Sequence, residues 1–240
     1  MTPSALRNHT AFLITAAGTS SRFALSAGGG LPVKKEFLLL GGTPLLARTL
    51  GACLESRAAS TFVVVYTPGL RSETEEALAS VHASVHFVSG GQTRQDSVCC
   101  GLAYLNELPD PPRYVLIHDG ARPWIPAEVI LRVLESTVSR GAAAPVIPLP
   151  DAVKQIGEDS RITGHLDRST TASIQTPQGF LFSEILEAHR RAAGNGKCYV
   201  DDTELYTDYI GEVYTVAGDI ANRKVTYPSD LEQAEGDTVV

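Results

Sequence analysis

A chain of 240 residues with a hydrophobic fraction of 43% and a charged fraction of 20% can bury one large core, which excludes disordered and fibrous proteins. Its formal net charge of -7 argues against nonspecific binding to nucleic acid or to an anionic membrane, because that affinity comes from clustered Lys and Arg. Its apolar runs are shorter than the roughly 18 residues of a membrane span, and no hydrophobic signal core precedes them, so we expect a cytoplasmic protein.

Apolar runs rich in β-branched residues alternate along the chain with stretches whose apolar residues recur at helical spacing. The runs that predict strands are 11–17, 61–67, 85–90, 113–120, 142–149 and 212–218. The stretches that predict helices are 43–56, 71–81, 95–108, 126–141 and 183–194. Strands that are apolar on both faces and separated by helices indicate an α/β fold, with a mostly parallel sheet covered by helices on both faces. We therefore expect one domain over residues 1–240, with ligands beyond the carboxyl ends of the strands.

The first strand is followed by Ala16, Ala17 and Gly18, and basic residues come shortly after. Small residues let backbone N–H groups approach a ligand closely, and such groups can surround phosphate oxygens. Arg22 and Lys35 would add positive charge at the same point, which implies a polyanionic ligand. The segment is neither a P-loop nor a G-x-G-x-x-G motif, and an ordinary turn with solvated basic residues is the alternative.

A second candidate segment, SGGQTRQDSV at 89–98, follows the third predicted strand. Gly90 allows a close approach of the chain, Arg94 offers several hydrogen-bond donors, and Ser97 lies about one helical turn further on the same face. The alternative is a plain helix start, with Asp96 near the positive end of the helix dipole.

The fourth predicted strand ends in His118 and Asp119, within HDGARPW at 118–124. A carboxylate at a strand end can hold a metal ion or substrate hydroxyls. A simple ion pair between Asp119 and Arg122 would account for both residues without any ligand. For His118 we expect packing or hydrogen bonding rather than catalysis.

Residues 150–176 break the alternation, because they mix polar and apolar residues and contain glycines typical of turns. We predict an extended β-arm over about 150–176. An isolated hairpin is marginally stable in water, so this arm would lie against something, and a partner subunit is one candidate.

Six segments together resemble the 2-C-methyl-D-erythritol 4-phosphate cytidylyltransferase family, bacterial isoprenoid-pathway enzymes that join CTP to a sugar-alcohol phosphate. In chain order they are TAAGTSSRF, KKEFLLLGGTPLLARTL, GGQTRQDSV, IHDGARPW, LDRSTTASIQTPQGF and NRKVTYPSDL. The resemblance as a whole runs from about residue 11 to residue 236. The resemblance implies a Rossmann-like nucleotidyltransferase fold with a protruding β-arm that pairs two subunits into a homodimer.

The resemblance also implies a role for individual residues. Those near the nucleotide would be Ala16, Ala17, Gly18, Gly90, Arg94 and Ser97. Those that bind the acceptor would be Asp119, Arg168, Thr176 and Lys224, with Thr176 lining the pocket and Asp119 also near the metal. The catalytic cations would be Arg22, Lys35, Arg168 and Lys224, with Arg168 supplied by the arm.

The implied reaction is an in-line attack by a phosphate oxygen of the acceptor on the α-phosphorus of CTP, with release of pyrophosphate. The attacking phosphate is already ionised, so no general base is needed, and the cationic side chains together with Mg²⁺ or another divalent cation offset the repulsion between two anions.

Three positions depart from the family pattern. Ser20 replaces a frequent glycine in a lengthened loop, Ala152 replaces a substrate-contacting threonine, and Asp201 replaces another threonine. The two missing hydroxyls leave open an alternative acceptor, such as ribitol 5-phosphate. A noncatalytic nucleotide-binding dimer module is the alternative from another class. We expect Lys34, beside Lys35, to be solvated.

Overall fold

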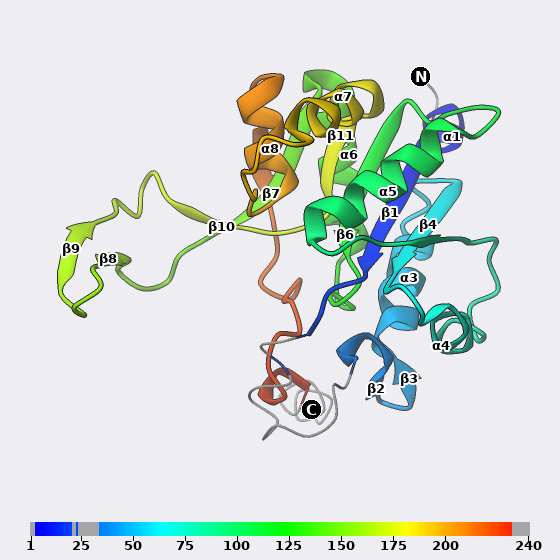
Figure 1. The fold of residues 1–240 in the computed structure, drawn as a ribbon, viewed down its shortest axis with the longest axis horizontal. Coiled ribbons are helices and arrows are strands. Elements are labelled where there is room, and N and C mark those ends of the chain that lie inside the picture. Colours follow the sequence, from blue (N-terminus) through cyan, green and yellow to red (C-terminus); the bar gives the residue numbers. More distant parts are fainter. Residues whose placement is uncertain (1–2, 21–22, 24–33, 232–240) are drawn as a thin grey trace.

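The structure of the protein, a computed structural model, describes residues 3–20, 23 and 34–231. At its centre is an eight-stranded sheet in the order β10, β7, β11, β6, β1, β4, β5, with β12 also paired to β7 (Figure 1). The strands are β1 (Thr10–Ala16), β4 (Thr61–Tyr66), β5 (His86–Ser89), β6 (Tyr114–Asp119), β7 (Ala142–Pro148), β10 (Ala172–Ile174), β11 (Gln178–Leu181) and β12 (Tyr214–Ala217).

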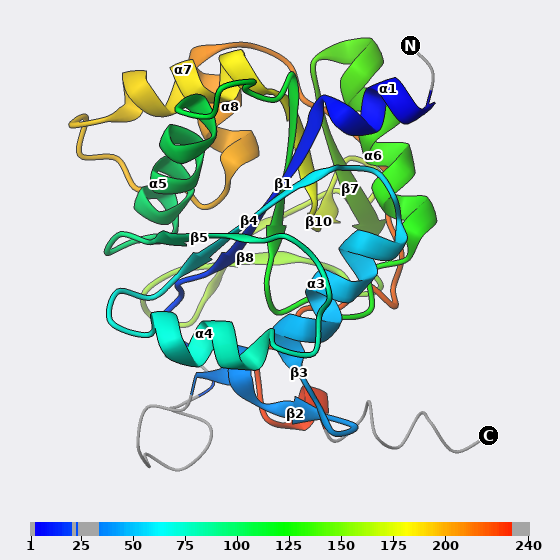
Figure 2. The same cartoon turned by 90° about the vertical axis from the view of Figure 1, so that its right-hand side faces the viewer.

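Helices cover both faces of this sheet (Figure 2). The helices are α1 (Pro3–Asn8), α3 (Leu45–Glu55), α4 (Arg71–Ala77), α5 (Arg94–Asn106), α6 (Ala127–Arg140), α7 (Phe182–Ala192) and α8 (Asp202–Tyr209). The turn η1 (Lys35–Phe37) and the short strands β2 (Leu39–Leu40) and β3 (Thr43–Pro44) precede α3.

Alternate residues of the central strands enter two separate hydrophobic cores, as the period of a strand requires. Phe12 and Ile14 of β1 pack in the core that contains α3 and α6, whereas Leu13 packs in the core that contains α5, α7 and α8. Both faces of β1 are therefore buried, which explains its continuous apolar sequence.

The six strands and five helices predicted from the sequence are all present, with ends that differ by a few residues. β1 pairs in parallel with β4 and β6, and β4 pairs in parallel with β5, so the carboxyl ends of these strands meet at one edge. The α/β fold with a mostly parallel sheet is confirmed. The sequence analysis missed β11, which enters antiparallel between β6 and β7.

The stretch predicted as an arm contains the hairpin of β8 (Lys154–Ile156) and β9 (Ile162–His165), which stands away from the body (Figure 1). β10 returns to the body and pairs with β7. The last residues of the predicted range 150–176 therefore belong to the central sheet, because residues 172–174 complete the edge of β7. Within the described part, none of the helices has the length and apolar character needed to cross a membrane.

Candidate active site

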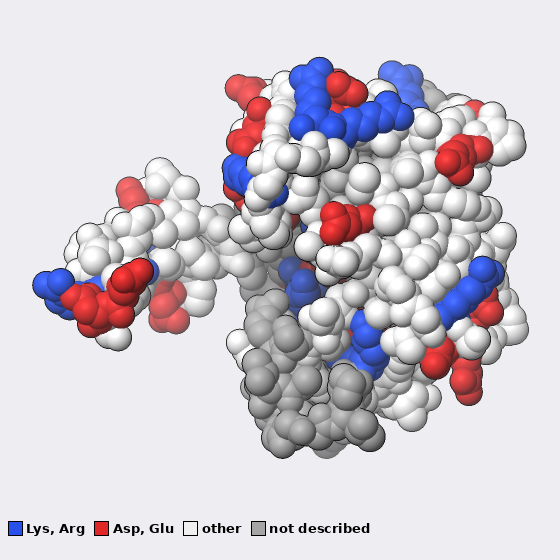
Figure 3. Space-filling model, viewed as in Figure 1, with Lys and Arg blue, Asp and Glu red and all other residues white. Residues whose placement is uncertain are grey.

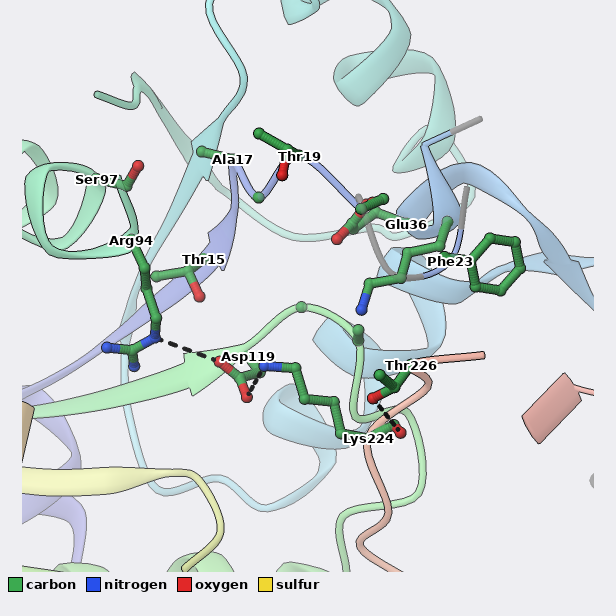
Figure 4. A pocket seen from close by; sticks show the side chains of 15 residues that line it. Thr15, Ala17, Thr19, Phe23, Glu36, Arg94, Ser97, Asp119, Lys224 and Thr226 are labelled. Atoms are coloured by element: carbon green, nitrogen blue, oxygen red, sulfur yellow. Dashed lines mark hydrogen bonds and ion pairs between the residues drawn. The ribbon is translucent and has the colours of Figure 1, made fainter. Parts of the chain in front are cut away.

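A pocket of about 230 Å³ lies at the carboxyl ends of β1 and β6, next to the first turn of α5 (Figure 4). Its wall includes the turn after β1, the turn η1 and residues 224–226. The lining residues that the sequence predicted are Ala17, Gly18, Lys35, Arg94, Ser97, Asp119 and Lys224. Residues from distant parts of the sequence thus meet beyond the carboxyl ends of the strands, where the fold class predicts a ligand.

Asp119 forms the negative centre of this pocket. Its Oδ2 lies 2.8 Å from Nζ of Lys224 and 3.4 Å from Nε of Arg122, and its Oδ1 lies 3.7 Å from Nε of Arg94. Figure 4 shows Arg94 and Lys224 reaching the carboxylate from opposite sides. Burial by itself would raise the pKa of Asp119, but the three cations hold the pKa well below its usual range. The pair of Asp119 and Arg122 expected as an alternative exists, but it is one contact of a larger cluster.

Arg94 occupies the first position of α5, and the helix start fixes its backbone. The side chain of Thr93 accepts from the N–H of Asp96 at 3.0 Å, and the carboxylate of Asp96 accepts from the N–H of Thr93 at 3.1 Å. This reciprocal cap satisfies two backbone donors. The guanidinium of Arg94 also pairs with Asp202, with Nη1 at 2.8 Å from Oδ2.

Gly90 and Ser97 shape the wall between β5 and α5. A Cβ atom at Gly90 would lie 2.6 Å from Cβ of Ala17 and 2.8 Å from Oγ of Ser97, so only glycine lets the two strand ends approach this closely. The hydroxyl of Ser97 donates to the carbonyl of Thr93 at 2.8 Å and accepts from N–H of Gly91 at 3.2 Å. Gly90 thus supports the pocket through packing.

The turn after β1 is tied to η1 by Lys34 and by Glu36, of which sequence reasoning did not single out Glu36. The ammonium group of Lys34 donates to the carbonyl of Gly18 and to the hydroxyl of Thr67, and burial lowers the pKa of Lys34. The carboxylate of Glu36 accepts from Oγ of Ser20 at 3.2 Å. The expectation of a solvated Lys34 was wrong, because this side chain links the ends of β1 and β4.

Lys224 is carried by a segment that is anchored on the sheet. Nδ2 of Asn222 donates to the carbonyl of Thr176 at 2.9 Å, and Nη1 of Arg122 donates to the carbonyl of Asn222 at 2.7 Å. Nζ of Lys35 donates to the carbonyl of Val225 at 2.6 Å. These contacts place the ammonium groups of Lys35 and Lys224 at the same pocket.

Thr176 was expected to line the pocket, but its side chain is buried behind it. Its hydroxyl accepts from the N–H of Asp119 at 3.1 Å and lies 2.9 Å from Nδ1 of His118. Thr176 therefore supports the end of β6 from inside the sheet. His118 is fully buried, and this burial lowers its pKa to about 4, so the imidazole is neutral at pH 7. The expected packing and hydrogen bonding of His118 are confirmed.

Other predicted residues lie elsewhere. Ala16 is the buried last residue of β1 and does not line the pocket. Arg168 is exposed in the turn after β9, on the arm, and is not part of the pocket wall. Arg22 lies outside the described residues.

Asp201 and Asp202 begin α8, an element that the sequence analysis did not predict. Oδ1 of Asp201 accepts from the N–H of Glu204 at 2.9 Å, and Oδ2 accepts from Nε2 of Gln178 at 3.1 Å. Asp201 therefore acts as the cap of the helix, a role for which carboxylates and hydroxyls are both suited. Two consecutive acidic residues before a helical stretch were the available signal. Ala152, the other position where a threonine is missing, is exposed on the arm.

The side chains around Asp119 do not by themselves form a metal-binding site. Both of its oxygens already face cationic side chains, and a divalent ion placed there would be repelled by them. Residues 3–20, 23 and 34–231 contain no group of three or more His, Cys, Asp or Glu side chains that could hold an ion. Any divalent cation near Asp119 would therefore need most of its ligands from the substrates, and coordination of a metal by Asp119 stays a prediction.

Comparisons with known proteins agree with this geometry. The family model for 2-C-methyl-D-erythritol 4-phosphate cytidylyltransferase matches residues 10–237. The protein of that name from Prochlorococcus marinus is 37% identical over 223 residues, which cover 93% of this chain and 95% of that protein. The bifunctional enzyme IspD/IspF of Solidesulfovibrio magneticus is 38% identical over 226 residues, which cover 91% of this chain and 54% of that protein. The chain thus spans about half the length of its bifunctional relatives.

Solved structures share the fold. The crystal structure of 2-C-methyl-D-erythritol 4-phosphate cytidylyltransferase from Thermus thermophilus superposes with a TM-score of 0.76 at 32% identity, covering 96% of this chain and 98% of that one. The 4-diphosphocytidyl-2C-methyl-D-erythritol synthase from Anaerococcus prevotii superposes with a TM-score of 0.81 at 23% identity, covering 96% of both chains. The second of these is evidence for the fold alone.

Proposed function

The chain belongs to the 2-C-methyl-D-erythritol 4-phosphate cytidylyltransferase family, and we propose that it catalyses the reaction of that name in the cytoplasm. In this proposal CTP and 2-C-methyl-D-erythritol 4-phosphate give the CDP-alcohol and pyrophosphate, a step of isoprenoid biosynthesis. The observation that carries the proposal is that Lys35 lines the same pocket as Arg94 and Lys224, which both face Asp119. Cations from distant parts of the chain are gathered where two phosphate-bearing substrates must approach each other.

The obstacle to this reaction is repulsion, since the acceptor phosphate must approach a triphosphate. Lys35, together with Arg22, would stabilise negative charge on the α-phosphate and on the departing pyrophosphate. Lys224 would hold the acceptor phosphate in line with the α-phosphorus, which gains rate by fixing the geometry before the attack. The acceptor phosphate is itself the nucleophile and needs no base, in agreement with a neutral, buried His118.

Asp119 would recognise the hydroxyl groups of the acceptor. An ionised carboxylate only accepts hydrogen bonds, and several cations keep this one ionised. Its Oδ2 binds Lys224, so the same side chain would align the cation that holds the acceptor phosphate. One carboxylate can thereby couple recognition of the hydroxyls to placement of the phosphate.

A divalent cation such as Mg²⁺ would accompany the triphosphate of CTP and reduce its charge. The support for this part of the proposal is chemical. Phosphate oxygens are suitable ligands for Mg²⁺, whereas Asp119 already faces three cations.

The active form in this proposal is a homodimer joined through the arm. Two features support it: β8 and β9 form a separate hairpin, and their side chains Ile156 and Ile162 are 61% and 58% exposed. Apolar side chains on an isolated hairpin need a surface to cover them. Arg168, close to the end of this hairpin, would then enter the site of the partner subunit.

The test is an acceptor assay on the purified protein, with pyrophosphate release as the measured quantity. We expect turnover with CTP and 2-C-methyl-D-erythritol 4-phosphate, and little with UTP or with ribitol 5-phosphate. Lys35→Ala and Lys224→Ala should each reduce kcat/KM by on the order of 10²-fold or more while the far-UV circular dichroism spectrum is unchanged. Preference for another polyol phosphate, or CTP binding without turnover on either acceptor, would overturn the proposal.

A further inference from the structure

A buried series of charged groups extends from the pocket into the helices behind it. Asp119 lines the pocket, Arg94 lies between Asp119 and Asp202, and Asp202 contacts His189 of α7 with Oδ1 at 3.2 Å from Nε2. The side chain of Asp202 is only 2% exposed, and that of Arg94 is 29% exposed. Arg94 is therefore shared between one carboxylate at the pocket and one behind it.

The two contacts of Arg94 are unequal. Nη1 lies 2.8 Å from Oδ2 of Asp202, the distance of a strong ion pair, whereas Nε lies 3.7 Å from Oδ1 of Asp119. The first distance is that of a close ion pair, and the second is too long for direct contact between charged groups, which lie about 2.7–2.9 Å apart, so Arg94 is paired with Asp202 and only faces Asp119. The other carboxylate oxygen of Asp119 is held by Lys224 at 2.8 Å.

Asp202 is itself held rigidly. Its backbone N–H donates to Oε1 of Gln178 at 3.2 Å, and its side chain contacts His189 as well as Arg94. Burial tends to raise the pKa of Asp202, but Arg94 and His189 lower it, so the carboxylate remains ionised. A fixed anion behind Arg94 can therefore compete with Asp119 for the guanidinium.

We propose that Asp202 is a positioning residue that holds Arg94 back from Asp119 and so leaves Oδ1 of Asp119 able to accept a hydrogen bond from a hydroxyl of the acceptor. Without the charge at Asp202, Arg94 would close the 3.7 Å separation and pair directly with Oδ1. The acceptor would then have to displace an ion pair. This inference rests on the proposed function, because it assigns Asp119 to the acceptor.

The experiment compares steady-state kinetics of the full-length protein and of Asp202→Asn, with each substrate varied in turn. Loss of a hydrogen bond to a charged group typically weakens binding by about tenfold or more, so we expect the KM for the acceptor to rise by that factor. The KM for CTP should rise by a smaller factor than the KM for the acceptor, since Arg94 remains in the pocket whereas Oδ1 of Asp119 becomes occupied. Asp208→Asn removes one exposed charge from the same helix and should change neither constant.

A double variant separates positioning from a structural role. In Asp202→Asn/Arg94→Gln the cation that faces Oδ1 of Asp119 is gone, so the acceptor KM should fall back toward the original value. A crystal structure of Asp202→Asn should show Nε of Arg94 in contact with Oδ1 of Asp119. An acceptor KM that is unchanged in Asp202→Asn, or that rises further in the double variant, would overturn the inference. If Asp202→Asn does not fold, the double variant is compared with Arg94→Gln alone. An equal acceptor KM in both is then expected, because Asp202 acts only through Arg94, and a higher acceptor KM in the double variant overturns the inference. Lack of turnover by the unmodified protein would instead contradict the proposed function.

Discussion

A buried carboxylate at a strand end can do more than neutralise one neighbour. Asp119 contacts Lys224, Arg122 and Arg94 at once, and each of these cations comes from a different place in the sequence. The sequence indicated a single pair with Arg122, because residues three apart in one segment are the contacts that a local pattern can reveal. The larger cluster depends on strand order and on the path of residues 222–226.

His118, beside Asp119, makes stability sensitive to mild acid. Its pKa is lowered from 6.5 to about 4 by burial, so it stays neutral in the folded protein while the unfolded chain takes up a proton below pH 6.5. The contribution is therefore complete above pH 6.5 and is lost as the pH falls toward 4. Over this interval His118 should reduce the free energy of unfolding by roughly 3 kcal/mol.

Urea unfolding of the original protein and of His118→Asn at several pH values between 4 and 7 measures this effect. The variant is expected to be less stable at pH 7, because a buried contact with Thr176 is altered, yet to lose less stability on acidification. The exposed residue His82 provides a matched control, since His82→Asn should follow the original pH dependence. Parallel curves for His118→Asn and the original protein would contradict a buried, neutral imidazole.

At the scale of elements, sequence periodicity was sufficient to predict the long helices and strands, but it was not sufficient to predict the short ones. The strand β1 and the helix α6 have enough residues for a period to be visible, and both were predicted. β11 has four residues and includes Gly179, and α8 has eight residues, which begin with Asp202 and follow the cap Asp201. Tertiary pairing determines such segments: β11 is a strand because β6 and β7 each supply a hydrogen-bonding edge.

Gly179 explains how β11 fits against α6. A Cβ atom there would overlap Oγ1 of Thr137 and would lie 3.0 Å from Cγ1 of Val133 and 3.1 Å from Cδ2 of Leu116. Gly179→Ala should therefore lower the free energy of unfolding by about 1–3 kcal/mol, as is typical of overpacking. Gly51→Ala in α3, where a Cβ atom would meet nothing within 4 Å, should instead raise it by up to about 1 kcal/mol. Equal stability of Gly179→Ala and the original protein in urea titrations would show that α6 can move aside.

At the scale of the whole molecule, the sequence predicted which strand ends form the site. It did not predict the side chains that lie behind the site residues and hold them. Ala17, Arg94 and Asp119 follow or end strands whose order is regular, so their meeting follows from the fold class. Asp202 reaches Arg94 only through the docking of α8, which no local pattern records. Thr176 was expected on the pocket wall but is buried behind it, because the sequence does not tell which side of the segment between β10 and β11 is buried.

The arm is the part of the molecule whose proposed role cannot be fulfilled within a single chain. On the face shown in Figure 3, Lys and Arg side chains lie close to the base of the arm, while the arm itself points outward. Arg168 is exposed on this arm, and the pocket of the same chain is lined without it. A site that uses Arg168 for catalysis would therefore need two chains, each lending an arm to the other.

Heterodimers of two inactive variants test this arrangement directly. Arg168→Ala and Lys35→Ala chains would carry different tags and be purified as a mixed pair. If the arm crosses, this pair has one site that lacks both side chains and one site that has both. If the arm crosses to the partner subunit, the mixed pair should recover about half of the original specific activity, since one of two symmetric sites is intact. If each chain uses its own Arg168, every site lacks one cation, and the pyrophosphate assay should show no more activity than the separate variants. Recovery near half therefore requires a shared site, and its absence in a confirmed heterodimer would refute one.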